Sequence, residues 1–262
     1  MAGSGPIAHN GRLTAGAEDT ELGEMIEIAG AKGTMPVYIA RPDGPGPWPG
    51  VLVIADAFGM TADVRAQADW LASEGYLAAA PNLYYWGGKM HCLVSTFRQA
   101  VTRKGPALDD LEATRAWLAA QPGATGKVGV IGFCMGGGFA LLLAAIGDYG
   151  AASVNYGRVP GDALRLLEDA CPVVASYGGR DRSLAGAPAA LQAALAANEV
   201  PFDLKVYPDA GHTFMNQHDA ADVPRVMTLL SPILGQGHKP EETADARRRI
   251  TAFFGTHLQP KA

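Results

Sequence analysis

Short apolar segments bounded by glycine or proline alternate along this chain with segments of helical periodicity. A strand buried on both faces of a sheet has this short, continuous apolar pattern. The segments that fit strands are residues 25–29, 35–40, 51–55, 77–80, 128–133, 151–155, 173–177 and 204–207. Helical patterns occupy residues 63–73, 108–119, 139–146, 188–197 and 246–258. This alternation predicts an α/β fold, with a mostly parallel sheet of about eight strands and helices on both faces.

The composition excludes several classes of protein. Charged residues make up only 18% of the 262 residues, against about 25% in a typical domain. The formal net charge is −5, whereas a nucleic-acid-binding protein needs a basic face and a disordered chain combines low hydrophobicity with high net charge. The longest strictly apolar run, residues 139–146, is far shorter than the roughly 20 residues of a membrane-spanning helix. We therefore expect a globular protein with neither nucleic-acid nor membrane partners.

The organisation of the chain predicts one domain. No internal repeat, interior linker or change of composition divides residues 21–262. Residues 1–20 are rich in Gly and Ala without periodicity, which predicts a poorly ordered N-terminal segment. They hold one Arg and no apolar block, so we expect no signal peptide and a cytoplasmic location. Either a monomer or a homodimer fits this organisation.

The three cysteines, Cys92, Cys134 and Cys171, form no Cys-x-x-Cys pair. Their number and spacing are untypical of a disulfide framework or a zinc site. An isolated cysteine is most often a small buried apolar residue, and its neighbours decide whether it does more. We therefore predict no metal site, and only Cys134 has neighbours that indicate chemistry.

Cys134 lies between a buried strand and an apolar helix, in the sequence Gly132-Phe-Cys-Met-Gly136. This is the pattern of a nucleophile elbow, with Cys in place of the commoner Ser. The nucleophile of an elbow occupies a strained turn, and glycines two residues before and after it let strand and helix approach closely. By itself the motif fits a Gly-rich turn with a buried Cys equally well.

An elbow nucleophile needs an acid and a histidine later in the chain, in that order. Asp181 follows the predicted strand 173–177, and His212 follows the predicted strand 204–207. The carboxyl ends of the strands in open α/β sheets are where active sites collect. Three such residues in the right order at successive strand ends predict a Cys134–His212–Asp181 triad.

The expected chemistry follows from this arrangement. His212 would take the proton of Cys134 or share it as an ion pair, and Asp181 would orient the imidazole and stabilise its charged form. The thiolate would attack an ester-type carbonyl and form an acyl-enzyme. The oxyanion would be bound by the backbone N–H groups of Met135 and of Ala57, which lies in the loop after the strand 51–55.

At these residues the sequence resembles the dienelactone hydrolase (carboxymethylenebutenolidase) family of α/β-hydrolases, over about residues 22–258. The matching motifs are Gly132-Phe-Cys-Met-Gly-Gly137, Gly179-Arg-Asp181, Ala210-Gly-His-Thr-Phe214, Ile54-Ala-Asp-Ala-Phe-Gly59 and Gly75-Tyr-Leu-Ala-Ala-Ala-Pro-Asn-Leu-Tyr84. The resemblance implies the α/β-hydrolase fold and a cofactor-free hydrolase with a Cys-His-Asp triad. It also implies small carboxylate-bearing lactones or related esters as substrates.

Two positions depart from the family pattern. Asp56 stands where the family commonly has a Glu that modulates the resting thiol, and Asp56 capping the following turn is the alternative. Asn216 stands where well-known members have an Arg that binds the substrate carboxylate, so it is a candidate substrate contact without charge. Arg98 or Arg103 could supply the missing charge, and Tyr85 could line the pocket.

The long stretch 216–242, just after His212, is predicted to be a lid or insertion beside the site. A surface excursion or an oligomer contact explains it equally well. Taken together, the sequence predicts a hydrolase of small ester or lactone substrates. The alternatives are a general carboxylesterase or thioesterase without dienelactone activity, and a non-catalytic α/β-hydrolase domain that binds small molecules.

Overall fold

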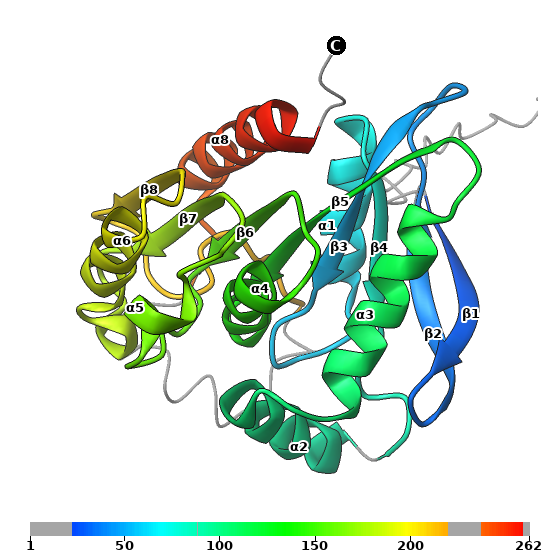
Figure 1. The fold of residues 1–262 in the computed structure, drawn as a ribbon, viewed down its shortest axis with the longest axis horizontal. Coiled ribbons are helices and arrows are strands. Elements are labelled where there is room, and N and C mark those ends of the chain that lie inside the picture. Colours follow the sequence, from blue (N-terminus) through cyan, green and yellow to red (C-terminus); the bar gives the residue numbers. More distant parts are fainter. Residues whose placement is uncertain (1–22, 88, 220–236, 259–262) are drawn as a thin grey trace, which may run out of the picture.

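A single mixed sheet runs through the part of the chain that this computed structural model describes, residues 23–87, 89–219 and 237–258 (Figure 1). Its strands are β1 Glu24–Gly30, β2 Gly33–Ala40, β3 Trp48–Ile54, β4 Leu77–Pro81, β5 Ala124–Phe133, β6 Ala151–Asn155, β7 Val173–Gly178 and β8 Phe202–Tyr207. They lie in the order β1-β2-β4-β3-β5-β6-β7-β8. β2 pairs antiparallel with β1 and β4, and every later pairing in this order is parallel. The predicted α/β fold with a mostly parallel sheet is confirmed.

The burial of the strands explains their sequences. Every residue of β4, β6 and β7 is buried, as a continuous apolar run requires when both faces of a sheet are covered. The edge strands are different. In β1, exposed and half-buried residues alternate, and β8 carries the exposed Lys205 beside one half-buried Asp. Charge on an edge strand discourages pairing with another chain.

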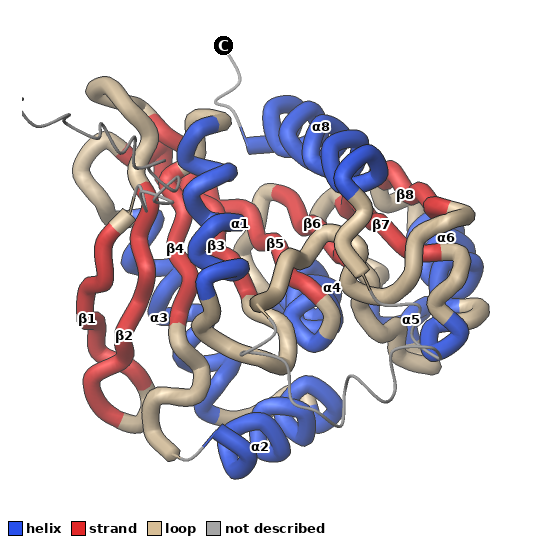
Figure 2. The backbone as a smooth tube through the Cα atoms, turned by 180° about the vertical axis from the view of Figure 1, so that it is seen from behind, coloured by secondary structure: helices blue, strands red, loops and turns tan. Residues whose placement is uncertain are grey.

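Helices cover both faces of the sheet. The longer ones are α1 Ala62–Ser73, α2 Lys89–Thr102, α3 Pro106–Ala119, α4 Met135–Ile146, α6 Ala187–Ala197 and α8 Pro240–Leu258, and α5 Ala163–Leu166 is a single turn. α1 and α8 pack on one face, and α3, α4 and α6 pack on the other (Figures 1 and 2). The helix α4 is buried over most of its length because it is apolar all round.

Helix α2 is the main element that the sequence pattern did not predict. Its buried positions include Cys92, Thr96 and Gln99, which recur at helical spacing. Two of these three residues are polar, so the apolar periodicity of an amphipathic helix is weak. Gln99 uses its amide oxygen to accept the N–H of Ala107, at 2.7 Å, in the first turn of α3. A helix whose inner face makes polar contacts is difficult to recognise from hydrophobic spacing alone.

Two predicted segments fall outside the described residues. The N-terminal segment 1–20 is one of them, and most of the predicted lid, residues 220–236, is the other. Within the described residues, none of the helices is long and apolar enough to cross a membrane.

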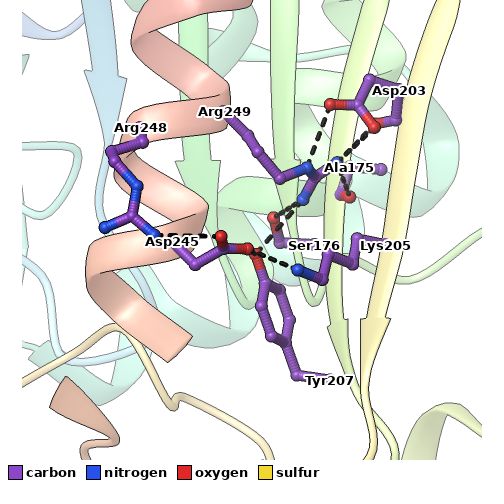
Figure 3. Close-up of polar contacts among 8 residues, drawn as sticks. All are labelled: Ala175, Ser176, Asp203, Lys205, Tyr207, Asp245, Arg248 and Arg249. Atoms are coloured by element: carbon purple, nitrogen blue, oxygen red, sulfur yellow. Dashed lines mark hydrogen bonds and ion pairs between the residues drawn. The ribbon is translucent and has the colours of Figure 1, made fainter. Parts of the chain in front are cut away.

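A polar cluster attaches α8 to the outer strands of the sheet (Figure 3). Arg249 donates to the Asp203 carboxylate through Nε, at 3.0 Å, and its Nη2 forms an ion pair with the same carboxylate at 2.7 Å. Its Nη1 lies 3.4 Å from the Ser176 hydroxyl, so one guanidinium reaches both β7 and β8. Asp245, one turn earlier, accepts the Lys205 ammonium at 2.6 Å and the Tyr207 hydroxyl at 2.9 Å. These contacts supplement an apolar stripe on α8 made by Ala246, Ile250, Phe254 and Leu258.

We expect Arg249→Met to lower the free energy of unfolding by about 1–2 kcal/mol, because it removes charge-assisted hydrogen bonds from a side chain that is only 15% exposed. Urea unfolding followed by circular dichroism measures the loss. Arg248→Met is the matched control: Arg248 is 71% exposed and, among the described residues, has Asp245 as its one ion-pair partner, so its removal should change stability by less than about 0.5 kcal/mol. Equal losses in the two variants would contradict the assignment.

Candidate active site

Cys134 lies at the sharp turn between β5 and α4. Its backbone angles are φ 52° and ψ −112°, a region that non-glycine residues rarely adopt. The turn is held by two backbone hydrogen bonds, from Cys134 N–H to the Asn155 carbonyl at 3.0 Å and from Gly138 N–H to the Cys134 carbonyl at 3.2 Å. Strained backbone of this kind persists only where surrounding structure enforces it, and it is common at active sites. The elbow geometry predicted for Cys134 is therefore present.

The glycines around Cys134 are required by close backbone contacts. A Cβ on Gly132 would lie 1.9 Å from the Gly136 carbonyl oxygen, and a Cβ on Gly136 would lie 2.3 Å from that of Ile54. At Gly137 the corresponding distance to the Asn155 oxygen is 2.7 Å. None of these backbone atoms has room for a methyl group. The Gly-x-Cys-x-Gly spacing thus reflects how tightly α4 packs against the ends of β3, β5 and β6.

Asp181 and His212 meet at the neighbouring strand ends. Asp181 follows β7, where its Oδ1 accepts the N–H of Ser183 at 3.0 Å and also the Ser183 hydroxyl. Its Oδ2 lies 2.6 Å from Nδ1 of His212, which follows β8. The remaining ring nitrogen of His212 is thereby left for Cys134, with which the imidazole makes a hydrogen-bonding contact. The structure brings together the three residues that the sequence analysis proposed as a triad.

Electrostatics favour a charged His212. Burial alone would lower the pKa of this imidazole, but the hydrogen bond to Asp181 and the contacts with Cys134 raise it to about 10. For Asp181, burial acts to raise the pKa, and the hydrogen bonds from His212 and Ser183 overcome it, so its pKa is lowered. An anionic Asp181 therefore stabilises the imidazolium that forms when His212 takes up the thiol proton.

The loop after β3 lies beside the Cys134 turn. The N–H of Phe58 donates to Oδ1 of Asp56 at 2.8 Å, and the hydroxyl of Tyr84 donates to the Ala57 carbonyl at 3.2 Å. Within the described part of the chain, the N–H groups of Ala57 and Met135 donate no hydrogen bond. Both are therefore free to bind a ligand, as the predicted oxyanion hole requires.

A cavity of about 320 Å³ opens at Cys134. Its apolar wall includes Met135, Leu142 and Leu166, and its charged wall contains Arg103, Arg158 and Asp162. A larger and shallower groove of about 620 Å³ adjoins it between α5 and α6 and shares Arg158. That groove is lined mainly by Ala and Gly and contains none of Cys134, Asp181 and His212, whereas Cys134 lines the smaller cavity.

One known protein family matches most of this chain. The model of the family described as "Dienelactone hydrolase family" matches residues 35–258. The chain belongs to the dienelactone hydrolase family.

Individual relatives agree with this membership. The "Putative carboxymethylenebutenolidase" of Yersinia pestis is 36% identical over 200 residues, covering 69% of this chain and 74% of that protein. The carboxymethylenebutenolidase of Pseudomonas putida is 30% identical over 179 residues, covering 64% and 75%. The crystal structure of "Putative Dienelactone Hydrolase" from Klebsiella pneumoniae superposes with a TM-score of 0.72 at 28% identity, covering 89% of this chain and 98% of that one. The chain is therefore a hydrolase of this family.

In this member of the dienelactone hydrolase family, Asn216 belongs to a buried hydrogen-bond network. The Asn216 amide accepts the Tyr156 hydroxyl and donates to the carboxylate of Asp63, while the N–H of Gln217 donates to Asp63 at 2.6 Å. The ring of Tyr156 in turn packs edge-on against His212, with 5.4 Å between ring centroids. Asn216 thus anchors the loop that carries His212, and the structure does not place it among the residues that line the cavity at Cys134.

The other two candidate substrate contacts also lie away from this cavity. The Tyr85 hydroxyl accepts the N–H of Lys32 at 2.7 Å and donates to Asp110 at 3.3 Å, so it is engaged beside the β1–β2 turn. Arg98 is exposed on α2, whereas Arg103, just after the end of that helix, lines the cavity. Sequence spacing alone did not distinguish these two arginines. Arg158 was missed altogether, although it too follows a strand end, that of β6.

Asp56 makes a contact that the sequence analysis did not foresee. Its Oδ2 lies 2.7 Å from Nε2 of His218, six residues after His212, and both side chains are buried. Within the described residues the structure gives no hydrogen bond between Asp56 and Cys134. Its predicted role as a modulator of the thiol stays a prediction.

The described residues hold no group of three or more His, Cys, Asp or Glu side chains suited to a metal ion.

We expect Gly136→Ala to lower the free energy of unfolding by at least about 2 kcal/mol, because the new methyl group would meet the Ile54 and Ala55 carbonyl oxygens at 2.3 and 2.5 Å. Chemical unfolding provides the measurement. Gly138→Ala, two residues along the same helix, is the matched control. Its nearest atom would be 3.9 Å away, so the better helix former should be neutral or stabilise by about 0.5–1 kcal/mol. Similar effects at both positions would refute the packing argument.

Proposed function

We propose that this chain hydrolyses small esters or lactones through a covalent acyl-enzyme on Cys134. The observation that carries the proposal is the geometry at the carboxyl ends of β5, β7 and β8: a strained Cys134 in contact with His212, whose Nδ1 lies 2.6 Å from Asp181. Membership of the dienelactone hydrolase family supports the same reaction class. The names of relatives such as the Pseudomonas putida carboxymethylenebutenolidase point to lactones among the substrates.

The reaction would begin with transfer of the thiol proton from Cys134 to the free ring nitrogen of His212. The thiolate then attacks the substrate carbonyl carbon, and the carbonyl oxygen becomes an oxyanion bound by the N–H groups of Ala57 and Met135. As the tetrahedral intermediate collapses, the carbon–oxygen bond to the alcohol breaks and His212 returns the proton to the leaving alkoxide. In a lactone the alcohol stays attached to the acyl group.

In deacylation His212 again acts first as a base, and Cys134 is now the leaving group. His212 removes a proton from a water molecule, the hydroxide attacks the thioester carbonyl, and Cys134 leaves as a thiolate that recovers its proton from His212. Asp181 keeps Nδ1 of His212 hydrogen-bonded throughout, so the other nitrogen always faces the reacting atoms. Water is the only co-reactant, and no cofactor is needed.

The charged wall of the cavity favours a substrate with a negative charge. Arg103 and Arg158 both line it. Arg103 pairs with Asp162, which also accepts Arg165 at 3.2 Å, so one carboxylate serves two of the arginines. The described residues give Arg158 no ion-pair partner. We therefore infer that a carboxylate-bearing ester or lactone is preferred over a neutral one. Arg103 and Arg158 would supply the positive charge that is missing at position 216, where this chain has Asn in place of the family's Arg.

Cys134→Ala should reduce hydrolysis of 4-nitrophenyl acetate by at least about 10³-fold, because removal of a nucleophile leaves only the residual effect of the oxyanion hole and binding. Release of 4-nitrophenolate measures turnover, and circular dichroism verifies the fold. Cys171→Ala is the control, since burial raises the pKa of the Cys171 thiol to about 12 and makes it unreactive. Turnover by Cys134→Ala at the wild-type rate would eliminate the acyl-enzyme mechanism.

Arg103→Met should raise KM for 3-acetoxybenzoate about tenfold and leave KM for phenyl acetate nearly unchanged, because these esters differ only in a carboxylate. A tenfold change corresponds to about 1.4 kcal/mol, a modest value for a charge-assisted hydrogen bond to a partly exposed side chain. Arg98→Met, on the exposed part of α2, serves as the comparison and should alter neither KM. If Arg103→Met affects both esters alike, the cavity does not select for charge through this residue.

A further inference from the structure

Asp56 and Asp181 have similar contacts. Each aspartate accepts, through Oδ1, the backbone N–H two residues later in the chain: Phe58 at 2.8 Å for Asp56 and Ser183 at 3.0 Å for Asp181. Each presents Oδ2 to a histidine, at 2.7 Å for His218 and 2.6 Å for His212. Both histidines belong to the loop that follows β8. A single loop therefore supplies one imidazole to the reacting groups and a second to the loop after β3.

His218 touches the loop after β3 at two points. In addition to its ion pair with Asp56, its ring packs edge-on against the ring of Phe58, with 4.7 Å between centroids. Its side chain is 9% exposed and that of Asp56 is 4% exposed. A carboxylate this deeply buried requires polar partners. His218 places Nε2 2.7 Å from Oδ2 of Asp56 and so supplies one such partner.

These contacts determine how the Ala57–Phe58 peptide is oriented. Its N–H belongs to Phe58 and donates to Asp56, and its carbonyl belongs to Ala57 and accepts the Tyr84 hydroxyl. The turn is closed by the N–H of Gly59, which donates to the Asp56 carbonyl at 3.2 Å. With both ends of this peptide held, the preceding N–H, that of Ala57, has a defined direction. This N–H is one of the two donors proposed for the oxyanion.

The loop after β8, which carries His212, is held in place by contacts other than those of His218. Gln67 donates to the Met215 carbonyl at 3.0 Å, and Thr243 donates to the Phe214 carbonyl at 2.9 Å. Asp63 accepts Asn216 and Gln217 in the network described above. Loss of the His218 side chain would therefore leave His212 anchored and would act mainly on the loop 55–59.

We propose that His218 is a positioning residue for the oxyanion hole, acting through Asp56. It holds the Asp56 carboxylate against the N–H of Phe58, and this contact aims the N–H of Ala57 at the reacting carbonyl. In this arrangement Asp56 shapes the oxyanion loop rather than modulating the Cys134 thiol. The inference rests on the proposed function, because an oxyanion forms only if an acyl carbon is attacked.

The test compares ester turnover with alkylation of the same cysteine. His218→Leu should lower kcat for 4-nitrophenyl acetate about 10- to 100-fold with KM changed less than threefold, since losing one oxyanion donor completely lowers kcat about 10²–10³-fold. Alkylation of Cys134 by iodoacetamide forms no oxyanion, so its rate should stay within twofold of wild type. His218→Gln, which retains an N–H donor, should recover at least part of the loss in kcat. His238→Leu is the control, because His238 lines the same small cavity as His218 and should not alter kcat.

A second variant separates positioning from a general loss of structure. Asp56→Asn in the His218→Leu background keeps an oxygen for the N–H of Phe58 and removes the buried carboxyl group that has lost its histidine partner, so kcat should rise above that of His218→Leu alone. Wild-type kcat in His218→Leu would overturn the inference, as would a loss of kcat matched by an equal loss of alkylation rate. Failure of the proposed function would look different: wild-type turnover would then equal that of Cys134→Ala.

Discussion

The close contact between the backbone at Gly136 and the end of β3 is the constraint on which the rest of the site depends. It lets α4 begin immediately after Cys134, so the turn at that residue takes a positive φ of 52°. The register of the sheet places Ile54 opposite Gly132 and Phe133 opposite Asn155. The strands β3, β5 and β6 therefore end at the same level, and the loops that follow them surround the thiol. The strain at Cys134 is maintained by packing that a single methyl group would disrupt.

Buried aspartates connect these loops across the site. Asp181 orients His212, Asp56 holds the loop after β3, and Asp63 in the first turn of α1 holds the loop after His212. All three accept backbone N–H groups, which a carboxylate does with little loss of side-chain freedom because the side chain is short. Irregular loops lack the ladder hydrogen bonds of a sheet, so these carboxylates supply much of the order that catalytic geometry requires. Few charges are present in this chain, and several of the acidic ones are used in this way.

The sequence was informative wherever a residue's role follows from its position at a strand end. Cys134 and Asp181 follow buried strands, and His212 follows the edge strand β8. A parallel sheet brings such positions together whatever the details of the loops. The roles of Asn216 and His218 depend instead on how the loop after His212 folds back, and no local pattern indicates that. For the same reason Arg98 and Arg103 were indistinguishable until the end of α2 was located. Helix α2 itself escaped prediction because Thr96 and Gln99 occupy part of its inner face.

The acidic character of the whole chain does not conflict with an anionic substrate. Charges separated by more than about 8 Å are largely screened at physiological ionic strength, so distant carboxylates contribute little to the potential inside the cavity. The local charges are Arg103, Arg158 and Asp162, with Arg165 also bonded to Asp162. Within that group positive charge is in excess, although the formal net charge of the chain is −5. The arginines lie just after α2, on α5 and in the loop after β6 rather than in the loop after β8 that carries His212. In the mechanism that we propose, Asn216 and His218 in the loop after β8 serve positioning, so charge recognition and oxyanion geometry would depend on different elements of the fold.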